Sequence, residues 1–211
     1  MEERCFVTGA AGFIGSHLVE GLLAEGCSVT GYDSLRWGQR QWVEHCLDDP
    51  RFSFVQADML DLPALKEAMR GHTVVFHLGA SADIRRGTED TRLDLENCTI
   101  ATFNVLEAMR ANGVKRLVFT SSGTVYGEAP VQPTPEDTGP ILPISLYGAA
   151  KLACEALISS YCHLFDMRAW IFRCGQIVGA RMGRGVIHDL IDKLRRNPRE
   201  LEILGDGNQV K

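Results

Sequence analysis

The sequence predicts an α/β protein with a doubly wound, parallel β-sheet, and three observations lead to this fold class. Short runs rich in β-branched and aromatic residues recur along the chain, segments with apolar residues three or four positions apart fill the intervals, and several of these segments end on glycine. Such alternation is typical of βαβ units whose helices cover both faces of a parallel sheet. The expected strands span residues 4–9, 28–33, 52–58, 73–80, 115–122, 169–174 and 201–205.

Helices are expected between these strands because their apolar residues repeat with the period of one helix face. Glycine at the end of three of them favours a left-handed cap. Residues 127–143, rich in proline and acidic side chains, follow no regular pattern and predict a surface loop before the last of these helices. The expected helices span residues 14–26, 63–71, 101–113 and 145–165.

Composition limits the classes of function. With 211 residues, of which 45% are hydrophobic, the chain can bury one large core, and its net charge of -5 argues against a nucleic-acid-binding protein. No apolar run approaches the roughly 20 residues of a membrane span, and the N-terminus has no signal-peptide pattern, so a cytoplasmic protein is expected. Seven cysteines without a C-x-x-C pair predict reduced core thiols and no metal site, and His77 is expected at a strand end.

The stretch VTGAAGFIGSHL, residues 7–18, follows the first strand and opens the first helix, with glycines at positions 9, 12 and 15. Gly9 permits a tight turn, Gly12 lets backbone amides approach a pyrophosphate, and Gly15 lets helix and strand pack closely. The helix N-terminus then faces the anion. A glycine-rich turn that serves packing alone is the alternative. The spacing favours a Rossmann-type dinucleotide site.

Acidic residues at the ends of the next two strands support this interpretation. Asp33 closes the second strand, where its carboxylate can accept hydrogen bonds from the adenosine ribose and repel a 2′-phosphate. NAD is therefore expected rather than NADP, although Arg36 weakens the preference. Asp58 ends the third strand and could meet the adenine amino group, or it could serve only as a helix cap. Residues 77–80, HLGA, end the fourth strand, so these groups converge on one crevice at the carboxyl ends of the strands.

A tyrosine and a lysine four residues apart, Tyr147 and Lys151, share one face of the expected helix 145–165. A nearby cation favours the phenolate, so Lys151 and the positive nicotinamide ring would lower the pKa of Tyr147 from about 10 and make it a usable base. Ser122, at the end of the fifth strand, could hydrogen-bond the same substrate hydroxyl. The alternatives are a solvated helix face for the pair and turn-amide contacts for the serine.

Four motifs, TGAAGFIGS, HLGA, TSSGTVYG and YGAAK, in this order and spacing, resemble the extended short-chain dehydrogenase/reductase family, specifically its NAD-dependent nucleotide-sugar epimerases and dehydratases. The resemblance implies a tightly held NAD, with Tyr147 as the base, Lys151 on the nicotinamide ribose and Ser122 as the hydroxyl partner. It places Asn97 on the active-site helix and implies a homodimer formed through helices on one sheet face. The expected cofactor contacts are Gly9, Gly12, Phe13, Ile14, Gly15, Asp33, Ser34, Asp58, Met59, Leu78, Gly79, Ala80, Asn97, Tyr147 and Lys151.

Two positions decide between branches of this family. Its dehydratases carry Asp-Glu directly after the residue that matches Ser122, whereas this chain has Gly123 and Thr124. A site without that acid has no evident proton source for elimination. The chain therefore resembles the UDP-glucose 4-epimerase subgroup, which works through a transient 4-keto sugar and leaves NAD unchanged overall. The alternatives are a dehydratase or reductase of the same family, and a non-catalytic NAD-binding redox sensor.

Two domains are expected, an NAD-binding Rossmann domain over residues 1–173 and the start of a substrate-binding lobe over residues 174–211. Gln176 stands where the family usually has an asparagine near the substrate phosphates, and Arg181 and Arg184 either contact the diphosphate or belong to a flexible basic loop. Family members usually continue beyond the final LGDGNQVK, so a truncated substrate lobe is expected. The expected substrate contacts are Thr124, Gln176 and Arg184.

Overall fold

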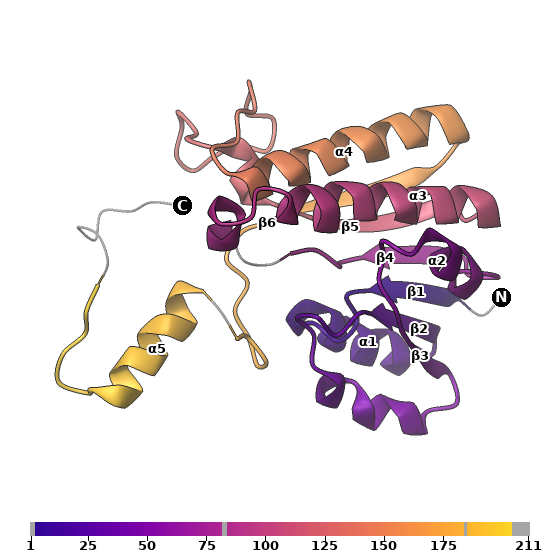
Figure 1. The fold of residues 1–211 in the computed structure, drawn as a ribbon, viewed down its shortest axis with the longest axis horizontal. Coiled ribbons are helices and arrows are strands. Elements are labelled where there is room, and N and C mark those ends of the chain that lie inside the picture. The colour runs from indigo at the N-terminus through magenta and orange to yellow at the C-terminus, as the bar shows by residue number, and fades with distance from the viewer. Residues whose placement is uncertain (1–2, 82–83, 184, 204–211) are drawn as a thin grey trace. The chain divides into compact units, whose positions relative to one another are not determined.

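A computed structural model of the protein describes residues 3–81, 84–183 and 185–203 (Figure 1). The chain divides into two compact units, Met1–Cys174 and Gly175–Lys211. The first unit contains the sheet and the predicted dinucleotide-binding motifs, and the second contains helix α5 (Val186–Arg196). That the second unit begins a substrate-binding lobe stays a prediction.

Six parallel strands form one sheet in the order β3-β2-β1-β4-β5-β6. The chain begins at β1 in the middle, adds β2 and β3 on one side and then crosses to β4, β5 and β6 on the other. This order confirms the predicted doubly wound fold, in which ligands bind where the winding direction reverses, here between β1 and β4. The strands are β1 (Arg4–Thr8), β2 (Ser28–Asp33), β3 (Phe52–Gln56), β4 (Val74–His77), β5 (Arg116–Ser122) and β6 (Arg168–Cys174).

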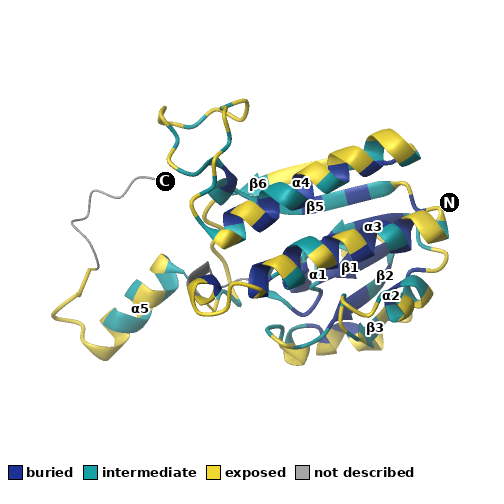
Figure 2. Ribbon diagram, turned by 45° about the horizontal axis from the view of Figure 1, so that its top comes forward, coloured by how far each residue is buried: buried dark blue, intermediate teal, exposed yellow. Residues whose placement is uncertain are grey.

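The four predicted helices are also present, and each lies against the sheet through one buried face (Figure 2). Helix α3 ends at Gly113, which adopts the left-handed conformation expected of a glycine cap. Ser145 caps α4, since its hydroxyl accepts a hydrogen bond from the Gly148 N–H at 3.0 Å. The helices are α1 (Phe13–Ala24), α2 (Leu62–Ala68), α3 (Ala101–Asn112) and α4 (Leu146–Phe165).

Each face of the sheet has its own core, because alternate residues of a strand point to opposite sides. Phe6, Leu117 and Phe119 pack into the core that lies under α2, α3 and α4. Val7 points the other way and joins Val19 of α1 in a smaller core. Helices α2, α3 and α4 therefore cover one face, and α1 covers part of the opposite face (Figures 1 and 2).

Helices lie on both faces of the sheet, as expected, but among the described residues the face that carries α1 is only partly covered. On the α1 side, β4, β5 and β6 expose an apolar groove of about 540 Å³. Trp170 and Phe172 of β6 are 49% and 55% exposed there. The reason is that α1 contacts β1 and β2 and reaches the groove only with Ile14 and Leu18.

Irregular segments complete the chain. Residues 127–143 contain no helix or strand, as predicted. A seventh strand was expected over 201–205, but its described part, 201–203, is not a strand, and the side chains of Leu201 and Ile203 are exposed. The short helical turns are η1 (Arg40–Trp42), η2 (Glu44–Asp48), η3 (Ile84–Thr88), the π-helical η4 (Leu95–Ile100) and η5 (Gly123–Tyr126).

Neither a membrane span nor a metal cluster occurs in the described ranges. No helix there is long and apolar enough to cross a bilayer. No group of three or more His, Cys, Asp or Glu side chains there could hold a metal ion. All seven cysteines are free thiols.

Candidate active site

The turn between β1 and α1 forms a cradle in which positions 9 and 15 have room for glycine only. Gly9 has a φ of +69°, and a Cβ atom on it would lie 2.8 Å from the Gly79 nitrogen. A Cβ atom on Gly15 would lie 2.0 Å from the Gly9 carbonyl oxygen. Helix α1 begins after Gly12, and no described side chain caps it. Backbone N–H groups of Phe13 and Ile14 therefore face the space in front of the helix, as a pyrophosphate would require.

Asp33 is fixed beside this cradle. Its carboxylate accepts hydrogen bonds from the Ala11 N–H at 3.0 Å and from the Leu35 N–H at 2.8 Å. Burial raises the pKa of Asp33, and these two backbone hydrogen bonds oppose that shift. The carboxylate is thus held at the end of β2, where the sequence places the ribose contact. Ser34, the next residue, accepts a hydrogen bond from the Arg36 N–H at 3.3 Å.

The ends of β3 and β4 line the same edge of the sheet. Met59 lies against Gly79, because a Cβ atom on Gly79 would be 2.6 Å from the Met59 methyl carbon. Asp58 is exposed and accepts the Leu60 N–H at 2.9 Å. Helix α2 is capped by Asp61, whose carboxylate accepts a hydrogen bond from the Ala64 N–H. The alternative role of Asp58 as the cap of this helix is therefore excluded.

Residues 77–80 bring one buried polar group and one apolar side chain to this edge. His77 is fully buried and shares hydrogen bonds with the hydroxyls of Thr8 at 2.7 Å and Thr102 at 2.9 Å. It ends β4, which confirms its prediction as a strand-end residue. Leu78 points into the open apolar groove, and Ala80 packs against the core on the other face.

Helix α4 places Tyr147 and Lys151 one turn apart, as predicted. The Lys151 ammonium lies 5.8 Å from the centre of the Tyr147 ring and 4.7 Å from that of Phe119. It donates a hydrogen bond to the Thr120 carbonyl at 2.8 Å and is 2% exposed. Tyr147 is partly buried against the core. A solvated helix face is therefore not the role of this pair.

The predicted lowering of the Tyr147 pKa involves Lys151 together with the nicotinamide ring and stays a prediction, because in the chain without NAD the pKa of Tyr147 is raised. Burial raises the pKa of Tyr147, and the neighbouring Cys98 and Asp94 raise it further. Burial also lowers the pKa of Lys151. Both groups are taken out of water, so each favours its neutral form more than it does at the surface. A further positive charge is needed to make the phenol acidic.

Ser122 is positioned at the last residue of β5 by the turn that follows. Its Oγ accepts hydrogen bonds from the Thr124 N–H at 3.2 Å and from the Thr124 hydroxyl at 3.0 Å. The proton of Ser122 itself is left to donate. A Cβ atom on Gly148 would be 2.7 Å from the Thr124 carbonyl oxygen, so this turn packs directly on the start of α4, next to Tyr147. Ser122 thus contacts a turn amide, as its alternative role predicts, and its own O–H group is still available as a donor.

Two groups near Tyr147 were missed from the sequence. Asp94 and Cys98 are buried, and the Ser81 hydroxyl donates to the Asp94 carboxylate. Both lie in the segment between β4 and α3, Asp94 directly before η4 and Cys98 within it. Asn97, expected on this segment as a cofactor contact, donates instead to the Leu93 carbonyl at 2.9 Å and accepts from Arg36 at 3.5 Å. Its contact with the cofactor stays a prediction.

The predicted substrate contacts are divided between the two units. Thr124 lies in the first unit, hydrogen-bonded to Ser122. Gln176 is an exposed residue of the second unit. Arg184 lies outside the described residues.

Comparisons with known proteins agree with this geometry. Residues 5–211 match the sequence profile of the NAD dependent epimerase/dehydratase family. UDP-glucose 4-epimerase from Mycolicibacterium smegmatis is 36% identical over 99% of this chain and 68% of its own length. The structure of UDP-glucose 4-epimerase from Thermotoga maritima with UDP-glucose superposes with a TM-score of 0.89 at 30% identity, over 97% of this chain and 66% of that one.

A third similar protein acts on a different sugar. UDP-glucuronic acid 4-epimerase from Bacillus cereus, in complex with UDP-glucuronic acid and NAD, superposes with a TM-score of 0.87 at 31% identity, over 98% of this chain and 67% of that one. The chain thus spans about two thirds of the length of the proteins it matches.

Proposed function

The chain belongs to the NAD dependent epimerase/dehydratase family, and on that premise we propose that it is the NAD-binding part of a nucleotide-sugar 4-epimerase. One observation carries the proposal: Tyr147 and Lys151 are held on one turn of α4, against the turn that presents Ser122. A base, a cation and a hydroxyl donor at the carboxyl edge of the sheet can move the proton of a sugar hydroxyl.

NAD is the cofactor we infer, and the cradle fits it. Only glycine can occupy positions 9 and 15, and Asp33 is fixed where it can accept from a ribose but would repel a 2′-phosphate. When bound, oxidised NAD supplies a hydride acceptor for the sugar carbon and a positive charge beside the phenol. That charge acts in the direction opposite to the burial that raises the pKa of Tyr147.

The side chains of this chain then have separate tasks. Tyr147, as the phenolate, takes the proton of the sugar 4-hydroxyl, and Ser122 donates a hydrogen bond from its own hydroxyl to the same oxygen. Lys151, tied to the Thr120 carbonyl, keeps its ammonium beside the phenol and within reach of a ribose. Loss of this proton together with the hydride of carbon 4 leaves a 4-keto sugar. This sugar must turn over in the pocket and regain the hydride on its other face, with Tyr147 returning the proton.

The two residues after Ser122, Gly123 and Thr124, favour epimerisation over dehydration. Gly123 and Thr124 provide no carboxylate there, and the Thr124 hydroxyl is engaged with Ser122. Elimination of water needs an added acid. We infer UDP-glucose and UDP-galactose as the substrate pair, supported by the epimerases from Mycolicibacterium smegmatis and Thermotoga maritima.

The test is to incubate the full-length protein with UDP-galactose and follow product and absorbance together. Interconversion with UDP-glucose and no net NADH is the expected result. Accumulation of a 4-keto product or of NADH would instead identify a dehydratase or a reductase. Binding of NAD without any turnover would leave the redox-sensor alternative. UDP-glucuronic acid in a parallel reaction tests the substrate assignment separately.

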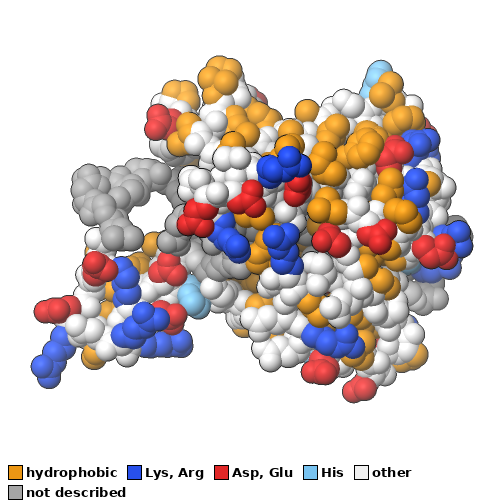
Figure 3. Space-filling view, viewed as in Figure 1, with side chains coloured by type: hydrophobic (Ala, Val, Ile, Leu, Met, Phe, Trp, Pro, Cys, Tyr) orange, Lys and Arg blue, Asp and Glu red, His pale blue; other side chains and the backbone are white. Residues whose placement is uncertain are grey.

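We also propose a cytoplasmic homodimer that pairs through α3 and α4. Hydrophobic side chains gather over these helices in Figure 3. Exposed apolar residues include Ile100 at the end of η4, Phe103 of α3 and Leu164 of α4. Seven free thiols suit a reducing compartment.

A further inference from the structure

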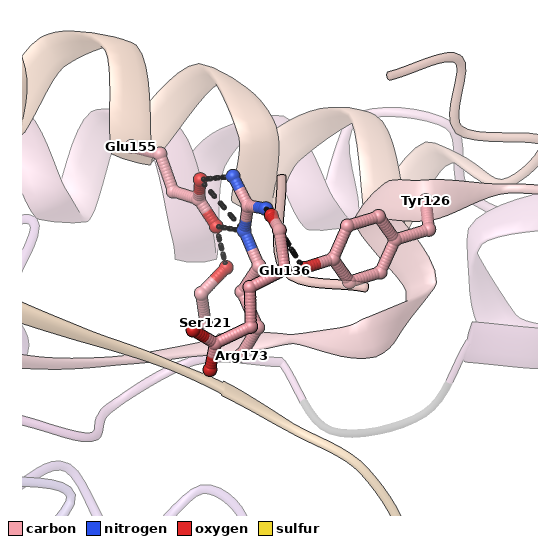
Figure 4. A network of polar contacts seen from close by, with 5 residues as sticks. All are labelled: Ser121, Tyr126, Glu136, Glu155 and Arg173. Carbon is pink, nitrogen blue, oxygen red and sulfur yellow. Dashed lines mark hydrogen bonds and ion pairs between the residues drawn. The ribbon is translucent and has the colours of Figure 1, made fainter. Parts of the chain in front are cut away.

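A polar network joins α4 to β5, β6 and the turn that follows β5 (Figure 4). At its centre is an ion pair between Glu155 of α4 and Arg173 of β6, with Arg173 Nη2 2.8 Å from a Glu155 oxygen and Nε 3.1 Å from the other. This two-point contact fixes both side chains. The Glu155 side chain is 10% exposed and that of Arg173 24%. The pair is therefore mostly sheltered from water.

The carboxylate of Glu155 connects the catalytic helix to the catalytic strand. Glu155 follows Lys151 by four residues and Tyr147 by eight, so the three side chains lie along one face of α4. Its carboxylate accepts a hydrogen bond from the hydroxyl of Ser121, which immediately precedes Ser122. The distance between α4 and the end of β5 is thus set one residue away from Ser122, the proposed hydrogen-bond donor to the substrate.

The guanidinium of Arg173 contacts the far end of the turn that begins at Ser122, the residue after Ser121. Its Nη1 donates to the Tyr126 hydroxyl at 2.9 Å and to the Glu136 carbonyl at 3.1 Å. Tyr126 is the last residue of η5, the turn that Ser122 begins. Glu136 belongs to the loop 127–143, and the Tyr126 hydroxyl also donates to its carbonyl at 3.2 Å. The ion pair therefore contacts Ser121 before the turn, Tyr126 at its end, and the loop 127–143 through the Glu136 carbonyl (Figure 4).

We propose that Glu155 and Arg173 are positioning residues for the reaction, which hold the turn Ser122–Tyr126 so that the Ser122 hydroxyl faces the substrate oxygen beside Tyr147. We call the contacts of Glu155 and Arg173 with Ser121 and Tyr126 the brace. The proposal rests on the proposed function, because only a reaction at Ser122 gives the brace a catalytic purpose. Ser122 acts only at hydrogen-bond distance, and a displacement of 1 Å in such a group can cost about 100-fold in rate. Neither Glu155 nor Arg173 touches the substrate in this role.

Removing either charge would be a poor test, because the remaining charge would be left buried and unpaired and the protein could unfold. Tyr126→Phe is milder, since it removes one hydroxyl and keeps the ion pair. The chain offers a matched control in a second Glu-Arg-Tyr group. Tyr161 donates its hydroxyl to Glu107 at 2.8 Å, and Glu107 is paired with Arg110 at 2.9 Å. Tyr161→Phe therefore deletes a tyrosine hydroxyl from a similar group away from the site, where it makes one hydrogen bond in place of the two made by Tyr126.

We expect Tyr126→Phe to lower kcat for the interconversion of UDP-galactose and UDP-glucose by about tenfold, with KM and NAD content unchanged. Tyr161→Phe should keep the wild-type kcat. The decisive comparison is made in a Ser122→Ala background, where Tyr126→Phe should slow the enzyme no further, because the group it positions is already gone. A second tenfold loss in that background would show that Tyr126 acts independently of Ser122 and would overturn the proposal.

Hydrogen exchange tests the brace without reference to turnover. The Thr124 N–H donates to Ser122, and the Gly127 N–H donates to the Thr124 carbonyl. Peptides covering 122–127 should exchange faster in Tyr126→Phe and in Ser121→Ala than in wild type or Tyr161→Phe. Unchanged exchange in both variants refutes the brace. A wild-type protein without interconversion refutes the proposed function instead, so the two failures are distinguishable.

Discussion

Gly15→Ala is the sharpest test of the dinucleotide cradle, because the added atom has nowhere to go. The new Cβ would lie 2.0 Å from the Gly9 carbonyl oxygen, 2.8 Å from the Gly9 carbonyl carbon and 2.9 Å from the Ala10 Cα. All three are backbone atoms, so no side chain can rotate away. Reaching ordinary contact at 3.4 Å from that oxygen requires a shift of more than 1 Å in the turn or in the start of α1.

The cost of such overpacking is about 1–3 kcal/mol and can be higher. At the low end we expect the melting temperature to fall by about 2–4 °C, and by about three times that at the high end. The same displacement moves the N–H groups at the start of α1 away from a bound pyrophosphate. We therefore also expect NAD to bind at least about tenfold more weakly, since one lost hydrogen bond to a charged group is worth about 1.5–3 kcal/mol.

Gly21→Ala is the matched control on the same helix. A Cβ atom on Gly21 would meet nothing within 4 Å, and alanine favours helix over glycine by about 0.5–1 kcal/mol. Thermal unfolding with and without NAD, and a titration of NAD, should show a stabilised Gly21→Ala that binds normally. A Gly15→Ala protein with wild-type melting and affinity would refute the cradle.

Three further predictions concern the base, the core and the dimer. Tyr147→Phe should lower turnover of UDP-galactose about 10²- to 10⁴-fold with bound NAD retained, and a smaller loss would exclude the phenol as the base. Burial holds the pKa of His77 at about 3 in the folded protein, below the usual 6.5, so the unfolded chain takes up the proton first and stability falls as the pH drops from 6.5 towards 3. Between pH 7.5 and 5 this should cost about 2 kcal/mol in urea unfolding, and His77→Gln should remove that part of the pH dependence; parallel pH curves for the two proteins would contradict it. Phe103→Glu, on an exposed position of α3, should convert a dimer to a monomer in light scattering after size exclusion, and an unchanged mass would exclude this face.

The fold was predictable to the extent that local pattern decides it. The alternating runs located β1 to β6 within a few residues, and Gly113 marked the end of α3 as a left-handed cap. Full cover of both sheet faces was not predictable. An apolar strand such as β6 has the same pattern whether or not a helix covers it, and here Trp170 and Phe172 remain exposed.

The site was predictable where one motif fixes both spacing and place. The pair Tyr147 and Lys151 and the glycine cradle are short-range patterns, and the sheet brings them to one edge. The raised pKa of Tyr147 was not predictable, because burial is its largest cause and a sequence does not give burial. Glu155 carried a usable signal, four residues beyond Lys151 on α4, but its partner Arg173 lies on a strand, β6.

Tyr147, Lys151 and Glu155 must stay four residues apart for their side chains to remain on one face of α4. Inserting a single residue between 147 and 155 would turn everything on one side of the insertion by about 100° around the helix axis. It would separate the phenol from the carboxylate that anchors the neighbouring strand, even if the helix stayed intact. An insertion after 155 would leave this trio aligned but would turn the buried Ile158 and Tyr161 away from the core. It should therefore act on stability, whereas an insertion before 155 should act on activity directly.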